Sequence, residues 1–216
     1  NFESFYTSIT VKSQKSIEPK KLRTPIINVC ACDYQLKEKF VEDFYHDCQK
    51  DELEKIFGID LLNDLSKENL QNAINNRRSI RAFNNETISK DDFLFITKDI
   101  FEFANTFGIE IYFVNNHIEG IKKGLYKNAN LENEADFTEK LTTLALNQKL
   151  SGQSAFTIFF TCKAGHNYFY SYILTGFIAQ ILYLRSTSLN LSCSGIGAYF
   201  DDISKEFLNT KNNIFY

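Results

Sequence analysis

The stretch Asn75-Asn76-Arg77-Arg78-Ser79-Ile80-Arg81-Ala82-Phe83 places three arginines around one serine. It follows a short predicted helix, for which Ser66 is the expected N-cap and which carries Leu70 and Ile74. A basic loop therefore follows a helix. Guanidinium groups and a hydroxyl at this spacing can bind a phosphate and a neighbouring polyol. The alternative is a solvated turn whose arginines pair with nearby acids.

The composition of the whole chain is that of an ordinary folded protein. Its 216 residues are 44% hydrophobic and 24% charged, enough for one large domain or two small ones. The formal net charge of -3 argues against nucleic acid as the main partner, although a local basic cluster can still bind one phosphate. The longest apolar stretch, Tyr168 to Leu191, contains Gln180 and Arg185 and predicts a buried helix, so we expect no membrane span.

The cysteines favour a reducing compartment. Five is an odd number in a chain that can build its own core, which predicts free thiols and a cytoplasmic location. The one candidate metal cluster is Cys30, Cys32, His46 and Cys48. Cys30 and Cys32 are closer together than the paired cysteines of structural zinc sites, so buried small side chains are the favoured interpretation and no metal is expected.

The chain is expected to divide near residue 64. Residues 1–64 are interpreted as an N-terminal lead-in with a short β-branched run at Pro25 to Ala31 and a helix over Leu36 to Phe57. Residues 65–216 are interpreted as the main module. Because the chain begins at Asn1 and contains no methionine, we expect it to be a piece of a longer protein.

Helices and strands alternate in the predicted main module. The expected elements are a helix from the capping pattern Ser89-Lys90-Asp91-Asp92 to Gly108, a strand over Ile109 to Asn115, a second strand around Gly124-Leu125-Tyr126 that forms a hairpin with it, a helix over Phe137 to Leu150, a buried strand over Ala155 to Cys162, the longest helix over Tyr168 to Leu189 with Asn190 as a left-handed cap, and a final helix from Asp201.

A second candidate binding segment is Gly195-Ile196-Gly197-Ala198. Glycine lacks a Cβ, so this backbone can approach a flat ring closely and present N–H groups to ring acceptors. The alternative is a pair of turn residues after a helix.

The sequence also contains weaker candidates for acid–base chemistry. Tyr126 and Lys127 are adjacent at the end of the predicted hairpin, where a proton-transfer role competes with a solvent-facing pair. His46, His117 and His166 lie in separate segments and are interpreted as loop or surface residues. The aromatic residues, 15% of the chain, indicate core packing rather than a cofactor site.

The order of motifs resembles the nitroreductase superfamily, in particular its SagB-type and azoline-forming peptide dehydrogenases. The resemblance covers Asn72 to about Leu208. It rests on Arg77 to Phe83 as an Arg-Arg-Ser-x-Arg-x-Phe loop, Thr87-Ile88-Ser89, Val114 to Gly120, Gly124-Leu125-Tyr126, Tyr172 to Gln180 in the long helix, and Ser194 to Asp202 as a Gly-Ile-Gly-x-Phe-x-Asp-Asp segment.

The resemblance implies an α+β fold with a mixed, mostly antiparallel sheet flanked by helices. It implies non-covalent FMN, with Arg77, Arg78, Ser79 and Arg81 on the phosphate and ribityl chain, and Gly195, Ile196, Gly197 and Ala198 against the isoalloxazine. It also implies a homodimer or tandem pseudo-dimer with the long helix at the interface. No catalytic base can be named.

The activity implied is that of an FMN-dependent oxidoreductase. Hydride transfer at flavin N5 would act on a modified peptide or small metabolite in a biosynthetic pathway, with NAD(P)H as a candidate electron donor and a precursor peptide and biosynthetic-complex proteins as candidate partners. The family has a Pro-Ser-rich loop where this chain has Phe103 to Gly108, and continues past the Asn213-Ile214-Phe215-Tyr216 end, so we expect a truncated tail. The alternative function is a flavin-empty module that serves as a binding or scaffold partner.

Overall fold

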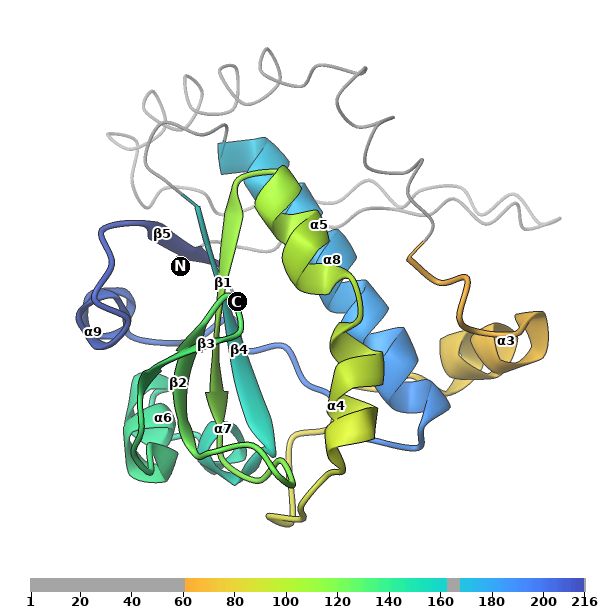
Figure 1. Cartoon of the computed structure of the whole chain (residues 1–216), viewed down its shortest axis with the longest axis horizontal. Helices are drawn as coiled ribbons and strands as arrows, with labels where there is room; N and C mark the ends of the chain where they lie inside the picture. The colour runs from red at the N-terminus through yellow and green to blue at the C-terminus, as the bar shows by residue number, and fades with distance from the viewer. Residues whose placement is uncertain (1–60, 163–167, 216) are drawn as a thin grey trace, which may run out of the picture. The chain divides into compact units, whose positions relative to one another are not determined.

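The computed structural model describes residues 61–162 and 168–215, which all belong to one compact unit of the chain (Figure 1). The strand predicted at Pro25 to Ala31, the helix predicted at Leu36 to Phe57 and the candidate metal ligands lie outside the described residues. His166 also lies outside them.

A five-stranded sheet forms the centre of the described unit. Its strands are β1 (Ile109–Asn115), β2 (Gly124–Lys127), β3 (Asn130–Asn133), β4 (Phe156–Cys162) and β5 (Asn213–Phe215), in the order β3-β2-β1-β4-β5. All four strand pairings are antiparallel. The strands predicted at Ile109 to Asn115, Gly124 to Tyr126 and Ala155 to Cys162 are confirmed, and the expected α+β class with them.

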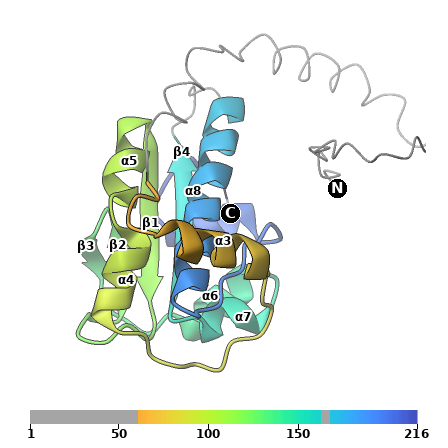
Figure 2. The same cartoon turned by 90° about the vertical axis from the view of Figure 1, so that its right-hand side faces the viewer.

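Helices cover both faces of this sheet (Figures 1 and 2). They are α3 (Lys67–Asn76), α4 (Lys90–Thr97), α5 (Ile100–Thr106), α6 (Thr138–Leu144), α7 (Lys149–Gln153), α8 (Tyr168–Ser188) and α9 (Asp201–Phe207). α4, α5 and α8 lie on one face, whereas α6, α7 and α9 lie on the other. The longest helix, α8, was expected at this position.

Alternation along β1 explains the two-sided core. Ile109 and Ile111 pack in a cluster with residues of α5 and α8, whereas Tyr112 and Val114 pack with residues of α6. Successive side chains of a strand point to opposite faces, so a strand that is apolar at nearly every position is covered on both sides. β1 is buried at every position except Glu110.

The predicted helix ends at Ser66 and Asn190 are confirmed. The Ser66 hydroxyl accepts a hydrogen bond from the Asn69 amide at 3.1 Å, which satisfies one of the free N–H groups at the start of α3. Asn190 has a φ of 59°, the left-handed conformation that ends a helix, and its N–H donates to the Thr187 carbonyl at 3.0 Å.

Two predicted helices are each broken into two. The helix expected from Ser89 to Gly108 ends at Thr97 and resumes at Ile100, with Asp99 in the left-handed region at a φ of 61°. The helix expected over Phe137 to Leu150 breaks between α6 and α7, where Leu146 and Asn147 have φ values of 55° and 62°. Left-handed residues cannot continue a right-handed helix, and periodicity alone gave no sign of them.

Within the described residues, no helix is long and apolar enough to cross a membrane. The same part of the chain contains no cluster of three or more histidine, cysteine or acidic side chains able to hold a metal ion.

Candidate functional site

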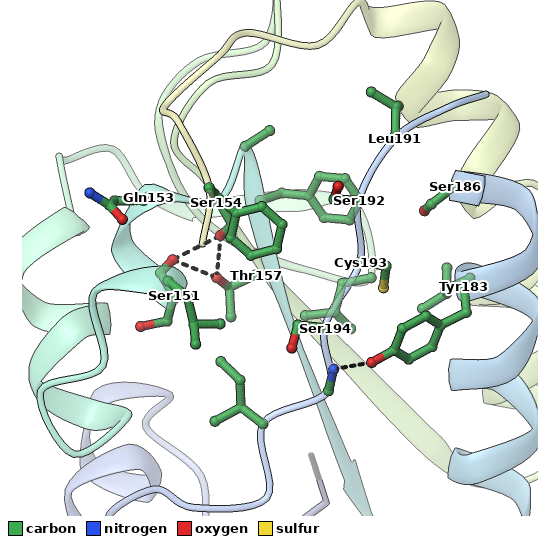
Figure 3. Close-up of a pocket in the computed structure, with 18 of the residues that line it drawn as sticks. Ser151, Gln153, Ser154, Thr157, Tyr183, Ser186, Leu191, Ser192, Cys193 and Ser194 are labelled. Carbon is green, nitrogen blue, oxygen red and sulfur yellow. Dashed lines mark hydrogen bonds between the residues drawn. The ribbon is translucent and has the colours of Figure 1, made fainter. Parts of the chain in front are cut away.

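A cavity of about 910 Å³ opens between the arginine loop, β4, α7, α8 and the segment after α8. Figure 3 shows part of its lining, with Tyr183 on α8 opposite Ser151, Ser154 and Thr157. The volume lies in the range of about 300 to 1,000 Å³ that is typical of sites for small molecules and cofactors. It brings predicted site residues from two separate segments together.

The arginine loop and the glycine segment, far apart in the sequence, run side by side. Ser79 and Cys193 form an isolated parallel bridge, and the Ile80 N–H donates to the Cys193 carbonyl at 3.1 Å. Ser79 from the first segment and Gly195 and Ile196 from the second all line the cavity. The two segments that the sequence singled out therefore form parts of one site.

Tyr183 joins the two segments, and sequence reasoning missed it. The Gly195 N–H donates to the Tyr183 hydroxyl at 2.6 Å, and this hydroxyl lies 2.9 Å from the Ser79 Oγ. The Arg77 guanidinium lies over the Tyr183 ring, 5.2 Å from its centroid, in a cation–π contact. The available signal was the spacing of Gly176, Gln180 and Tyr183, which puts them on one face of α8 toward the cavity.

The three arginines occupy different environments. None of the three lines the cavity: Arg77 is half-buried against Tyr183, whereas Arg78 and Arg81 are exposed. One Arg78 nitrogen, Nη1, donates to the carbonyls of Asn75 and Arg77, at 3.2 and 2.8 Å. Across residues 61–162 and 168–215, no carboxylate is within ion-pair distance of these arginines, so pairing with acids does not occupy them there.

The glycine segment differs from the expectation in one respect. The Gly195 N–H, expected to face a ring acceptor, is bound to Tyr183. Gly197 and Ala198 are exposed and do not line the cavity. A Cβ added at Gly197 would meet no atom within 4 Å, and its φ is not in the left-handed region, so the fold of the described chain does not itself require glycine there.

The opposite side of the cavity carries a cluster of hydroxyls (Figure 3). Ser154 Oγ and Thr157 Oγ1 are 3.0 Å apart, and each also lies within hydrogen-bond distance of the Ser151 carbonyl, at 2.8 and 3.0 Å. Both hydroxyl protons are therefore used inside the chain. Oxygen lone pairs remain to accept hydrogen bonds from a ligand.

Cys193 places a sulfur in the cavity wall between these polar groups. Burial raises the pKa of its thiol to about 12, so the neutral thiol dominates near pH 7. Burial likewise raises the pKa of Cys162. These thiols are weak nucleophiles in this environment.

The remaining acid–base candidates lie away from the cavity. Tyr126 is buried, stacks on Phe113 with 4.5 Å between ring centroids, and donates to the Lys122 carbonyl, so the solvent-facing interpretation is wrong for Tyr126. Lys127 pairs with Glu110 at 3.3 Å. Burial lowers the pKa of the half-buried His117. None of Tyr126, Lys127 and His117 lines the cavity.

An antiparallel sheet flanked by helices, with a cavity beside the longest helix, defines an α+β protein with one candidate binding site in its described residues. The sequence pattern of the Nitroreductase family matches residues 74–216, and the chain belongs to this family. A crystal structure of a protein from Anabaena variabilis assigned as a nitroreductase is similar, with 26% identity and a TM-score of 0.57 over 67% of this chain and 36% of that chain. The chain thus spans about a third of that protein's length. No curated protein matches the sequence.

Members of the Nitroreductase family typically bind FMN, and the cavity fits such a ligand. Ser79 lines the cavity and supplies a hydroxyl, and the Arg77 guanidinium, which lies over the ring of the lining residue Tyr183, supplies a nearby cation for a phosphate. Ile196 and Phe156 supply apolar lining for a flat ring. Phe103 to Thr106, in place of the family's Pro-Ser-rich loop, form part of α5 and do not reach the cavity.

Proposed function

We propose that the chain is an FMN-dependent oxidoreductase. The observation that supports this best is the meeting of Ser79 and Gly195 at the hydroxyl of Tyr183, on the rim of one cavity beside the Arg77 guanidinium. When bound, FMN supplies hydride transfer at its N5 position. The chain positions the cofactor: Arg77 and Ser79 bind the phosphate, and Ile196 contacts the isoalloxazine.

Arg78 and Arg81 are exposed cations of the same loop and are proposed to add positive charge to the phosphate site. Gly197 and Ala198 are exposed and follow the lining residues Gly195 and Ile196, and a Cβ at Gly197 would meet no atom within 4 Å. The Ser154 and Thr157 oxygens on the opposite wall can accept a hydrogen bond from an N–H group of the cofactor or the substrate. Of these residues, Ser154 and Thr157 are additions to the expected site, and none of them is assigned as a catalytic base.

The test of the proposed function is flavin binding by the purified chain. FMN fluorescence should be quenched on titration with the protein, and the visible flavin bands should remain with the protein after gel filtration. Reduction of the bound flavin by NADH or NADPH would then identify the electron donor. A chain that binds no FMN even in excess would contradict the proposal and leave the scaffold alternative.

The finer proposal is a SagB-type dehydrogenase that acts on a modified peptide or small metabolite, in the cytoplasm and with biosynthetic partners. The motif order Arg77 to Phe83 followed by Ser194 to Asp202 supports it. Turnover of azoline-containing peptides, with FMN reduction as the readout, tests this substrate class. Reduction of nitroaromatics or quinones without azoline oxidation would favour a nitroreductase activity instead.

We also propose that α8 contacts a second module, either an identical chain or a tandem copy. Gly176 supports a contact at the open edge of the cavity, which it lines, because glycine costs a helix about 1 kcal/mol relative to alanine and a Cβ at this exposed position would meet no atom within 4 Å. Gly176→Ala should therefore stabilise the isolated chain and weaken self-association, as measured by light scattering. Unchanged association would contradict the proposed contact at Gly176.

A further inference from the structure

The hydroxyl of Tyr183 lies between the Gly195 amide, which can only donate a hydrogen bond, and the Ser79 hydroxyl, which can donate or accept one. The Gly195 amide nitrogen is 2.6 Å from this hydroxyl, and an amide N–H cannot accept, so the Tyr183 oxygen accepts from Gly195. The Ser79 Oγ is 2.9 Å away on the other side, and either hydroxyl could donate in that contact. Its direction decides which residue keeps an unused proton.

Counting the protons favours one direction for this contact. Within the described chain, Ser79 is the acceptor available to the Tyr183 O–H, and Tyr183 is the partner of the Ser79 side chain. If Tyr183 donates, the unused proton belongs to Ser79, which is exposed at the cavity rim. If Ser79 donates, the unused proton belongs to Tyr183, which is half-buried. A free O–H is better hydrated on the more exposed of the two side chains, which is Ser79, so donation by Tyr183 is favoured.

We propose that Gly195, Tyr183 and Ser79 form a hydrogen-bond relay that directs the Ser79 proton to an oxygen of the cofactor's phosphate. The relay rests on the proposed FMN function. Each donation polarises the next, so the hydroxyl at the end of the chain becomes a stronger donor to an anion. Tyr183 acts through Ser79 and is a positioning residue, and the Arg77 guanidinium lies over its ring.

The relay predicts discrimination between FMN and riboflavin. Riboflavin has the same ring and sugar chain and lacks the phosphate. A hydrogen bond to a charged group is stronger than one to a neutral group, so loss of the relay should weaken FMN binding more than riboflavin binding. If Tyr183 only held the two loops together, its loss would weaken both flavins equally.

The experiment measures the dissociation constants of FMN and riboflavin for the unmodified chain, Tyr183→Phe, Ser79→Ala and the double variant. Tyr183→Phe keeps the ring over which Arg77 lies and should weaken FMN binding about tenfold and riboflavin binding less than about twofold. In the Ser79→Ala background, Tyr183→Phe should cause no further loss of FMN affinity. Tyr126→Phe is the matched control, because its hydroxyl bonds to the Lys122 carbonyl away from the cavity.

Equal losses for both flavins, or additive losses in the double variant, would overturn the relay while leaving FMN binding by the unmodified chain intact. A chain that binds neither flavin would overturn the proposed function and the relay together. If Tyr183→Phe fails to fold, the exposed Ser79→Ala substitution supplies the same comparison. An equal loss of FMN and riboflavin affinity in that variant would also overturn the relay.

Discussion

Arg185 on α8 donates from Nη1 to the Lys98 carbonyl at 2.6 Å, directly at the break between α4 and α5. The same nitrogen reaches the Ile96 carbonyl at 3.2 Å, and Nη2 donates to the Leu61 carbonyl. The side chain is fully buried, and Asp64 lies 3.8 Å from it. One guanidinium thus satisfies the Ile96 and Lys98 carbonyls, which a continuous helix would have satisfied itself.

Replacement of Arg185 should therefore destabilise the fold strongly. Arg185→Met keeps much of the volume and leaves three carbonyls without their donor, so we expect a loss of about 3 kcal/mol in the free energy of unfolding. Urea unfolding followed by circular dichroism measures it. Arg78→Met, the same change at an exposed arginine, is the control and should cost less than about 1 kcal/mol. Equal effects at the two positions would contradict the role of Arg185.

The break between α4 and α5, where Arg185 donates to the Lys98 carbonyl, could not be predicted from the local sequence. Apolar residues from Phe93 to Phe107 recur at helical spacing, and no glycine or proline interrupts them, so one helix was the natural prediction. The group that makes two helices possible is 87 residues downstream of Lys98. The strands were easier to predict, because their period of two and their β-branched residues are local properties.

The break between α6 and α7 gives a second stability prediction. Leu146 has a φ of 55° and an exposed side chain, so it bears the strain of the left-handed conformation without compensating burial. Leu146→Gly removes that strain and should stabilise the chain by about 0.5 to 1 kcal/mol, after the entropy cost of glycine is subtracted.

The control for Leu146→Gly is the same substitution at Leu94, which is equally exposed but lies inside α4. Leu94→Gly should destabilise by about 1 kcal/mol because glycine is a poor helix former. Thermal unfolding of both variants measures the difference. Destabilisation by Leu146→Gly would show that the turn depends on the leucine side chain.

The sequence predicted the two segments of the candidate site, but not the contacts that join them. The arginine loop stands out in the sequence because three arginines surround one serine, and the glycine segment because two glycines lie two residues apart. The structure brings Ser79 and Gly195 together through Tyr183. Tyr183 is one of many aromatic residues in the chain, and its hydroxyl matters only because folding places it between those two groups. The use of the Gly195 N–H by Tyr183 could not be inferred without that contact.

Arg77→Ala should weaken FMN binding. The guanidinium lies over the ring of Tyr183, which lines the cavity, and a hydrogen bond to a charged group contributes about 1.5 to 3 kcal/mol, so we expect the dissociation constant to rise about tenfold to a hundredfold. Fluorescence titration measures it. Lys122→Ala removes the same charge from an exposed pair with Glu134 away from the cavity and should leave affinity within about twofold. Equal affinity of Arg77→Ala and the unmodified chain would remove Arg77 from the phosphate site.

Cys193 should react slowly with iodoacetamide at neutral pH. Burial raises the pKa of its thiol to about 12, and only the thiolate reacts, so the thiolate fraction near pH 7 is on the order of 1 in 10⁵. The alkylation rate should then rise about tenfold per pH unit through pH 10, whereas an ordinary thiol levels off above its pKa of about 8.5. Mass spectrometry of the peptide that contains Cys193 follows this residue alone, and the urea-unfolded chain is the reference. A plateau near pH 9 in the folded chain would show that Cys193 is in contact with water and that the cavity wall is open at the sulfur.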